Sequence, residues 1–500
     1  MAKSIMVLGT MSGSGKSTLV AGLCRLFRQD GHRVAPFKSQ NMALNSYVTA
    51  QGLEMGRAQA MQAEAAGIPP SVHMNPILLK PTGEMGSQVI VNGEVRAHMS
   101  AVDYFAYKHT LIPDIRQAYD ALAAEHDIIV LEGAGSPAEI NLNQNDIVNL
   151  GMAAMVDAPA LLVGDIDRGG VFASLYGTMA LLPPSDRARI HGIIINKFRG
   201  DIEILRPGLA LLEELVETPV MGVLPMLNLE LDDEDSLAPR LTQTQIRRPI
   251  DVAVLRLPRI SNFTDFYPLE QQPALGVRYV GSVRQLGQPD LLILPGSKSS
   301  MDDLRYLRQS GLEAAILRLA AAGVPVLGIC GGYQMLGQSL ADPEGVEGGG
   351  EMQGMGLLPI HTVFGRQKQR RRVEGSCRRV EGFFACLQGA RFSGYEMHMG
   401  ESQLEEDCPA LTLHTSGGDL PGGAVCGHVM GCYVHGVFDS GEWGKQLAAA
   451  LLAQKGLKTS WLEPAQDIAA HKERQYDALA DALRQALDIQ GIYKLLDHGA

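Results

Sequence analysis

The chain has 500 residues, of which 46% are hydrophobic, 20% are charged and 5% are aromatic. This composition excludes a disordered chain, a small disulfide-stapled domain and a fibrous repeat, and the length predicts two to four folded units. The formal net charge of −12 produces a field that repels phosphate backbones and anionic lipid. We therefore expect neither a nucleic acid nor a membrane as a partner.

Seven cysteines occur without any C-x-x-C pair, which argues against a disulfide framework and against a thiolate zinc site. No stretch approaches the roughly 20 apolar residues that cross a bilayer, and the apolar run before Gly9 is too short for the core of a signal peptide. These features predict a cytoplasmic protein. We also predict no obligate protein partner.

Short, continuous apolar runs alternate with segments of helical spacing along most of the chain. The expected strands lie at residues 4–8, 127–131, 159–163, 190–195, 251–255, 291–294 and 324–329. Such runs are typical of buried parallel strands with crossover helices on both faces of the sheet. The predicted fold class is therefore α/β.

A glycine-rich turn, Gly9-Thr-Met-Ser-Gly-Ser-Gly-Lys-Ser-Thr18, follows the first expected strand and begins a helical run. Backbone N–H groups of such a turn can bind nucleotide phosphates, Lys16 can reach the β and γ oxygens, and Ser17 can bind Mg²⁺. We therefore predict ATP and Mg²⁺ as ligands. The predicted nucleotide-binding residues of the turn are Gly9, Thr10, Gly13, Gly15, Lys16, Ser17 and Thr18.

The spacing of this turn is unusual, because five residues rather than four separate Gly9 from Gly15. It resembles the phosphate loop of dethiobiotin synthetase and its relatives. Met11 stands where the dimerising partition ATPases carry a signature lysine, which disfavours a switch ATPase.

Two charged residues later in the same half are candidates for the nucleotide site. Glu132 ends an expected strand beside glycines, where a second Mg²⁺ ligand would stand, although a solvated strand-end carboxylate is the alternative. Lys38 follows Ala35-Pro-Phe37, and its place resembles that of the lysine that meets the transferred phosphoryl group in the dethiobiotin synthetase family. An ordinary surface lysine remains open for that position.

The composition changes between residues 226 and 250, where an acidic stretch is followed by a polar one without expected strands. We place a domain boundary there. The predicted organisation is an ATP-dependent domain at 1–230, a linker at 231–250, a second domain at 251–445 and a helical tail at 446–500.

A second motif, Gly328-Ile-Cys330-Gly-Gly332, joins an expected buried strand to a helical segment. Its glycines permit the strained turn that lifts a nucleophile clear of the sheet, and the N–H of Gly331 can form part of an oxyanion hole. Gly296, in a glycine turn that ends an earlier strand, is the candidate for the other N–H. His435 ends a strand about 105 residues after Cys330 and is the candidate general base.

Two further segments carry less information. Five of the seven residues from Arg366 to Arg372 are basic, and we expect a solvated loop there rather than a site that steers a polycarboxylate. In the tail, Tyr476, Leu479, Leu483 and Leu487 have helical spacing, which predicts an amphipathic helix that packs on a domain and stops at Gly491.

The thiol motif resembles the triad glutamine amidotransferase domain, in which a thiolate releases ammonia from glutamine. Val437 stands where many members carry a glutamate two residues after the histidine, so the sequence supports a Cys330–His435 dyad with an unknown orienting group. Ammonia needs an electrophile, and a carboxylate becomes one when ATP converts it to an acyl phosphate. The two motifs together predict ATP- and glutamine-dependent amidation of a carboxylic acid.

Seven segments spread along nearly the whole chain resemble the cobyric acid synthase family. They are 36–46, 56–60, 75–81, 165–172, 195–201, 257–265 and 394–400. The resemblance implies a dethiobiotin-synthetase-like domain followed by a class I glutamine amidotransferase domain. It also implies that glutamine and a corrinoid are the substrates, with amidation at the b, d, e and g carboxylates of adenosylcobyrinic acid a,c-diamide.

The resemblance adds three candidate residues. Asp146, in a matching stretch at 141–149, is implied in metal or substrate positioning, and a loop-capping aspartate is the alternative. Glu54 stands where related synthetases place a further acidic Mg²⁺ ligand. Asn196 falls at a strand end where the adenine base would lie.

Two other functions remain open at this stage. One is cobyrinic acid a,c-diamide synthase, which shares both domains, although the stretch 256–265 favours the cobyric acid synthase family. The other is a nucleotide-sensing regulator that makes no amide, against which Cys330 and His435 argue.

Overall fold

A computed structural model describes residues 2–82, 86–142, 145–231, 241, 248–405, 409–415, 418–462 and 468–498. The chain forms two compact units. The first unit comprises Met1–Ala43, Leu53–Asp232 and Lys472–Ala500, and the second comprises Leu44–Gly52 and Asp233–His471. Most of the predicted linker at 231–250 lies outside the described residues.

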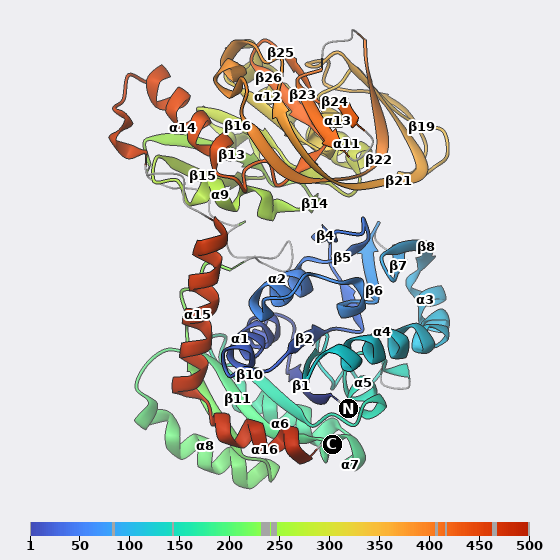
Figure 1. The fold of residues 1–500 in the computed structure, drawn as a ribbon, viewed down its shortest axis with the longest axis vertical. Coiled ribbons are helices and arrows are strands. Elements are labelled where there is room, and N and C mark those ends of the chain that lie inside the picture. The colour runs from blue at the N-terminus through green and yellow to red at the C-terminus, as the bar shows by residue number, and fades with distance from the viewer. Residues whose placement is uncertain are drawn as a thin grey trace. The chain divides into compact units, whose positions relative to one another are not determined.

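The first unit is built on a parallel sheet of six strands in the order β12-β11-β10-β1-β9-β2 (Figure 1). The strands are β1 (Lys3–Gly9), β2 (Val34–Phe37), β9 (Ile128–Glu132), β10 (Ala160–Asp165), β11 (Ile190–Phe198) and β12 (Val220–Pro225). Every residue of β2, β9 and β10 is buried, which explains their continuous apolar sequences. The predicted α/β class is confirmed.

A second sheet of the first unit has the order β3-β6-β7-β8. Its strands are β3 (Gln40–Met42), β6 (Ile77–Pro81), β7 (Gly86–Val91) and β8 (Glu94–Ser100), and the short strand β5 (Glu54–Gly56) precedes α2. The α-helices of the unit before its C-terminal segment are α1 (Lys16–Gln29), α2 (Arg57–Ala66), α3 (Ala101–Tyr107), α4 (Ile112–Glu125), α5 (Leu150–Met155), α6 (Val171–Leu181), α7 (Pro184–Arg187) and α8 (Ile202–Val216).

The second unit contains a sheet in the order β15-β13-β16-β18-β26-β25, in which only β25 is antiparallel. Its strands are β13 (Ile250–Leu255), β15 (Leu275–Val280), β16 (Leu291–Leu294), β18 (Val326–Ile329), β25 (Ala424–Cys426) and β26 (Val429–Cys432). The helices of the unit are α9 (Tyr267–Glu270), α10 (Val283–Leu286), α11 (Ser300–Gln309), α12 (Leu312–Ala321), α13 (Gly331–Met335) and α14 (Glu442–Gln454).

A mixed seven-stranded sheet completes the second unit. It consists of β19 (Ser339–Asp342), β20 (Gly350–Gln353), β21 (Ile360–Cys377), β22 (Arg391–Leu404), β23 (Leu411–Thr415), β24 (Gly418–Gly422) and β27 (Val434–His435). Three short strands stand apart from this sheet, namely β4 (Ser46–Val48), β14 (Ile260–Ser261) and β17 (Gly296–Ser297). The loop expected at Arg366–Arg372 is wrong, because these residues lie inside the long strand β21.

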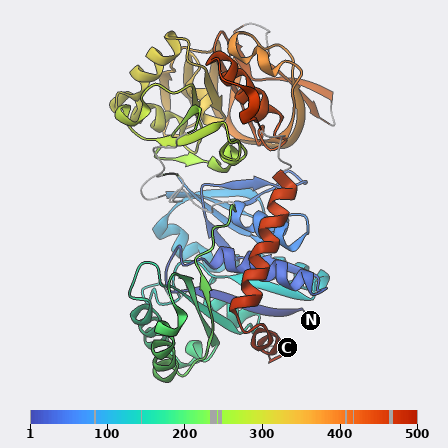
Figure 2. The ribbon, with the colours of Figure 1, turned by 90° about the vertical axis from the view of Figure 1, so that its left-hand side faces the viewer.

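The C-terminal segment forms α15 (Ile468–Ala486) and α16 (Ile489–His498). Figures 1 and 2 show α15 running along the first unit beside α1. The predicted apolar face is buried in the core of that unit, through Tyr476, Leu479, Leu483 and Leu487. The predicted stop at Gly491 is wrong, because α15 ends at Ala486 and Gly491 lies inside the next helix, α16.

Among the described residues, none of the helices combines the length and the apolar character that spanning a membrane requires.

Candidate active sites

The glycine-rich turn joins β1 to α1 at the carboxyl end of an internal strand of the parallel sheet. Gly13 and Gly15 have φ angles of 73° and 95°, in the left-handed region that glycine adopts without strain. A Cβ on Gly15 would also overlap the side-chain amide of Asn196, whose Nδ2 donates to the Ser14 carbonyl at 2.9 Å. Asn196 therefore contacts the backbone of the turn itself.

Two observations show that this turn fits nucleotide phosphates. The Ser14 hydroxyl is fully buried and has no hydrogen-bond partner among the described residues, so a ligand oxygen would satisfy it. The Lys16 ammonium lies over the turn and donates to the carbonyls of Met11 and Gly135, at 3.0 Å each. A cation and an orphaned donor thus lie in the same loop.

Glu132 is buried at the end of β9, and three polar side chains donate hydrogen bonds to its carboxylate. Its Oε1 accepts hydrogen bonds from Ser17 Oγ at 2.9 Å and from Lys38 Nζ at 2.7 Å. Its Oε2 accepts one from Gln62 Nε2. These hydrogen bonds satisfy the buried carboxylate and place Ser17, Lys38 and Glu132 in one cluster.

No cluster of three or more His, Cys, Asp or Glu side chains in the described part of the chain could hold a metal ion. At the nucleotide site, a magnesium ion would have two candidate protein ligands. Ser17 and Glu132 offer a hydroxyl and a carboxylate oxygen, and phosphate oxygens are the usual remaining ligands of Mg²⁺.

Glu54 has a different environment. It is fully buried at the start of β5, and its Oε1 accepts a hydrogen bond from Lys80 Nζ at 2.8 Å. A metal-binding role for Glu54 would require Lys80 to release this carboxylate.

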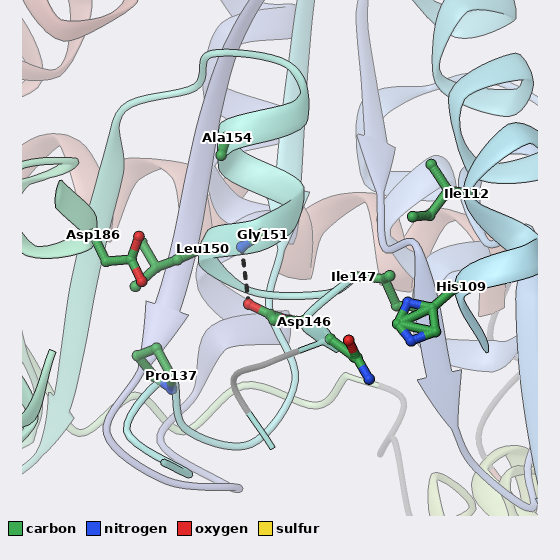
Figure 3. A pocket seen from close by; sticks show the side chains of 10 residues that line it. His109, Ile112, Pro137, Asp146, Ile147, Leu150, Gly151, Ala154 and Asp186 are labelled. Atoms are coloured by element: carbon green, nitrogen blue, oxygen red, sulfur yellow. Dashed lines mark hydrogen bonds between the residues drawn. The ribbon is translucent and has the colours of Figure 1, made fainter. Parts of the chain in front are cut away.

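Asp146 acts as a cap in this structure. Its carboxylate accepts three backbone N–H groups, from Val148 at 2.8 Å and from Asn149 and Gly151 at 2.9 Å each, just where α5 begins. The residue also lines a pocket of about 310 Å³ together with His109 (Figure 3). The contacts match the capping alternative, and a substrate role for Asp146 stays a prediction.

The second candidate site lies in the second unit, where β18 runs into α13 at Cys330. Cys330 has a φ angle of 52°, a strained conformation for a residue other than glycine and typical of a nucleophile elbow. A Cβ on Gly331 would lie 2.8 Å from the backbone N of Ser297, and a Cβ on Gly296 would lie 3.1 Å from His435 Cε1. The two glycine turns therefore approach the thiol and the imidazole without side chains.

His435 is buried and paired with a carboxylate that the sequence analysis did not assign. His435 Nδ1 and Asp265 Oδ2 are 2.6 Å apart, and the N–H of Gly436 donates to Asp265 Oδ1 at 3.2 Å. Burial by itself lowers the pKa of His435, but the charges of Asp265 and Cys330 raise it to about 10. The imidazole is therefore held protonated next to Cys330.

Three of the other described cysteines are buried thiols. Burial raises the pKa of the Cys24 and Cys377 thiols above the usual range and that of Cys432 to about 12. These thiols stay protonated and pack in the cores.

The structure adds two site residues that the sequence analysis missed, Asp265 and Gln62. Asp265 lies 170 residues before His435 and in no recognised catalytic motif, although it closes one of the family-like segments. Gln62 occurs with Gln59 at helical spacing in the alanine-rich α2, and both are fully buried. Buried polar residues on one helix face are a usable signal, because such groups need partners.

Two family models match the two halves of the chain. Residues 5–235 match the CobQ/CobB/MinD/ParA nucleotide binding domain, and residues 251–443 match the CobB/CobQ-like glutamine amidotransferase domain. The chain is therefore a glutamine amidotransferase with a nucleotide-binding domain. The regulator that makes no amide, kept open above, has no support in these matches.

Three relatives that match over the full length of the chain share one name. The cobyric acid synthase of Ruminiclostridium cellulolyticum is 56% identical over 504 residues, covering 100% of this chain and 98% of the relative. That of Lachnoclostridium phytofermentans is 53% identical over 514 residues, with 100% of both chains covered. That of Salmonella agona is 50% identical over 505 residues, with 99% of both chains covered. The chain therefore belongs to the cobyric acid synthase family, the glutamine-dependent amidotransferases of cobalamin biosynthesis.

Proposed function

We propose that the chain converts the b, d, e and g carboxylates of adenosylcobyrinic acid a,c-diamide into amides, using ATP and glutamine. The observation that carries this proposal is the presence of two different polar clusters on one chain. One gathers Ser17 and Lys38 around Glu132, and the other joins Cys330 and His435 to Asp265. The first suits charge stabilisation at phosphates, and the second suits release of ammonia.

In the glutaminase centre, the Cys330 thiolate attacks the amide carbon of glutamine and forms a thioester. His435 donates the proton with which the nitrogen leaves as ammonia, and it then accepts a proton from the water that hydrolyses the thioester to glutamate. Asp265 holds the orientation of the imidazole and stabilises its positive charge. Backbone N–H groups at Gly331 and Gly296 are the proposed oxyanion hole.

ATP, when bound, supplies the phosphoryl group that makes a substrate carboxylate reactive toward ammonia. The turn Gly9–Thr18 would hold the phosphates through its backbone, and Lys16 and Lys38 would balance their charge. Ser17 and Glu132 would bind Mg²⁺. Asn196, bonded to the turn, would support its shape beside the base.

The decisive experiment is mass spectrometry of corrinoids incubated with the protein, ATP, Mg²⁺ and glutamine. Adenosylcobyrinic acid a,c-diamide should show four successive mass losses, each corresponding to the replacement of –OH by –NH₂. Cobyrinic acid without the two amides serves as the parallel substrate. Two losses on that substrate and none on the diamide would identify an a,c-diamide synthase instead. We also propose that the enzyme works in the cytoplasm, where ATP and glutamine are supplied.

A further inference from the structure

The segment Leu44–Gly52 belongs to the second unit, although the residues on both sides of it belong to the first. It lies outside the matched amidotransferase region at 251–443. Three polar residues in and beside its strand β4, Asn45, Ser46 and Thr49, are buried, which is unusual for a short connection. Asn45 and Ser46 form hydrogen bonds with Asn262, a residue close to the glutaminase centre.

Asn45 binds the backbone of Asn262, and Ser46 binds its side chain. The N–H of Asn262 donates to Asn45 Oδ1 at 2.8 Å, and the N–H of Ser46 donates to Asn262 Oδ1 at 3.2 Å. All three residues are buried. Asn262 precedes the short turn that carries Asp265, whose N–H donates to the Asn262 carbonyl at 3.0 Å. The position of the carboxylate that orients His435 is thus tied to Asn45 and Ser46.

Tyr395 provides a second connection to the imidazole. Its hydroxyl donates to the Ser46 carbonyl at 3.2 Å and accepts from Asn262 Nδ2 at 3.2 Å. Its ring stacks on His435, with centroids 5.3 Å apart and an angle of 26° between the planes. Ser46 and Asn262 therefore fix the ring that covers one face of the catalytic histidine.

The segment is itself held by the basic stretch of β21. Arg372 Nε donates to the Val48 carbonyl at 3.3 Å, and its guanidinium lies over the Tyr47 ring, 5.0 Å from the centroid. The neighbouring Arg371 pairs with the buried Glu396 at 2.5 Å. Two of these basic residues thus have structural partners near the glutaminase centre.

We infer that Asn45 and Ser46 are positioning residues for glutamine hydrolysis, which hold Asp265 and Tyr395 against His435. Neither residue touches the reacting atoms. A shift of about 1 Å in a catalytic group can lower a rate about 100-fold, so anchoring of the imidazole on two sides affects turnover directly. The inference rests on the proposed glutaminase mechanism and extends its site into the N-terminal part of the chain.

The test is glutamate release by the full-length Asn45→Ala variant. We expect kcat to fall about 10- to 100-fold, because the variant loosens the hold of Asp265 and Tyr395 on His435. The KM for glutamine should change little, because the residues that contact the substrate are unchanged. Gln51→Ala is the matched control, since Gln51 is an exposed amide side chain of the same segment and should keep wild-type turnover. Tyr395→Phe keeps the stacked ring, loses the hydroxyl and should show a smaller fall in kcat.

The double variant that combines Asn45→Ala with Tyr395→Phe gives a second test of the same inference. Because Asn45 and Tyr395 both act through Asn262, the two effects should be less than additive. Wild-type kcat in Asn45→Ala and in Tyr395→Phe would overturn the inference. If Asn45→Ala lowers the thermal midpoint, Tyr395→Phe decides alone. Glutamate release needs no corrinoid, so failure of the proposed amidation in the wild type would appear separately.

Discussion

The two reaction centres differ in which charged group lies at the middle: a carboxylate in one and an imidazole in the other. Around Glu132, a buried carboxylate is surrounded by an ammonium, a hydroxyl and an amide, and each of these groups can also bind phosphate or metal. Around His435, a carboxylate and a thiol share one imidazole and raise its pKa. Phosphoryl transfer requires mainly positioning and charge balance, whereas amide hydrolysis requires a strong nucleophile. Each centre therefore has its own signature when a single residue is removed.

The largest expected effect is that of Lys16→Ala. The ammonium lies over the phosphate turn, so its loss should abolish amidation with glutamine and with ammonia alike. Glutamate release should persist, because the thiol centre is intact. Corrinoid amide formation and glutamate release are measured on the same samples. Continued amidation from ammonia would contradict the assignment of the nucleotide site.

Cys330→Ala should separate the two centres in the other direction. We expect glutamate release to fall at least about 10³-fold, because the nucleophile is lost. Amidation with high ammonia should remain near that of the wild type. The matched control is Cys426→Ala, at an exposed cysteine outside the centre, which should leave both reactions unchanged. Loss of the ammonia-driven reaction in Cys330→Ala would mean that the centres are not separable.

The Asp265→Asn variant tests the pairing of Asp265 with His435 through the pH dependence of glutamate release. The pKa of His435, about 10, falls when the carboxylate charge is removed, so the alkaline limb of glutamate release should move to lower pH. We also expect kcat at neutral pH to drop about 10²- to 10⁴-fold. The charge of Glu396 also acts on the imidazole. Glu396 is paired with Arg371, and the Asp265→Asn substitution changes neither residue. An unmoved alkaline limb would show that Asp265 does not set the charge of His435.

The same pKa affects stability. Because the folded value lies above the ordinary 6.5, the protonated ring contributes folding free energy that is fully present below pH 6.5. That contribution is lost as the pH rises through about 10. The thermal midpoint of the wild type should therefore fall more over this range than that of Asp265→Asn.

The smallest effect on chemistry, with a clear effect on stability, is expected from Leu483→Ala. Leu483 is fully buried in the first unit, and a Cβ on Gly22 of α1 would lie 2.8 Å from its Cδ2. The cavity should cost about 2–5 kcal/mol of folding free energy, measured by chemical denaturation. The more exposed Leu457 provides the matched control, and Leu457→Ala should cost about 0.5 kcal/mol or less. Equal losses in the two variants would contradict the docking of α15.

The parts of the molecule that could be predicted are those whose contacts are local in sequence. The turn Gly9–Thr18 and the elbow at Cys330 each form within about ten residues, so their glycines show the backbone that they adopt. Lys38 and Glu132 could be placed because Lys38 follows β2 and Glu132 ends β9, and the carboxyl ends of parallel strands meet at one edge of a sheet.

The parts that could not be predicted depend on long-range packing. Asp265 and His435 lie 170 residues apart, and they meet because the sheet places β13, β16, β18 and β26 side by side. Nothing in the sequence of Asn45 and Ser46 indicates that they join a different unit from Ala43. Gly491 is a good helix stop by propensity, but the apolar contacts of α16 override that preference.

The docking of α15 and α16 also has a consequence for the order in which the protein is made. The core of the first unit includes Tyr476 and Leu496, which are synthesised after every residue of the second unit. Domains usually fold in the order in which they leave the ribosome. Here the glutaminase unit has its complete sequence before most of α15 and all of α16 are synthesised, and the nucleotide-binding unit cannot complete its core until those helices are made. The unit whose sequence is synthesised first, up to Ala43, is thus the unit whose core is completed last.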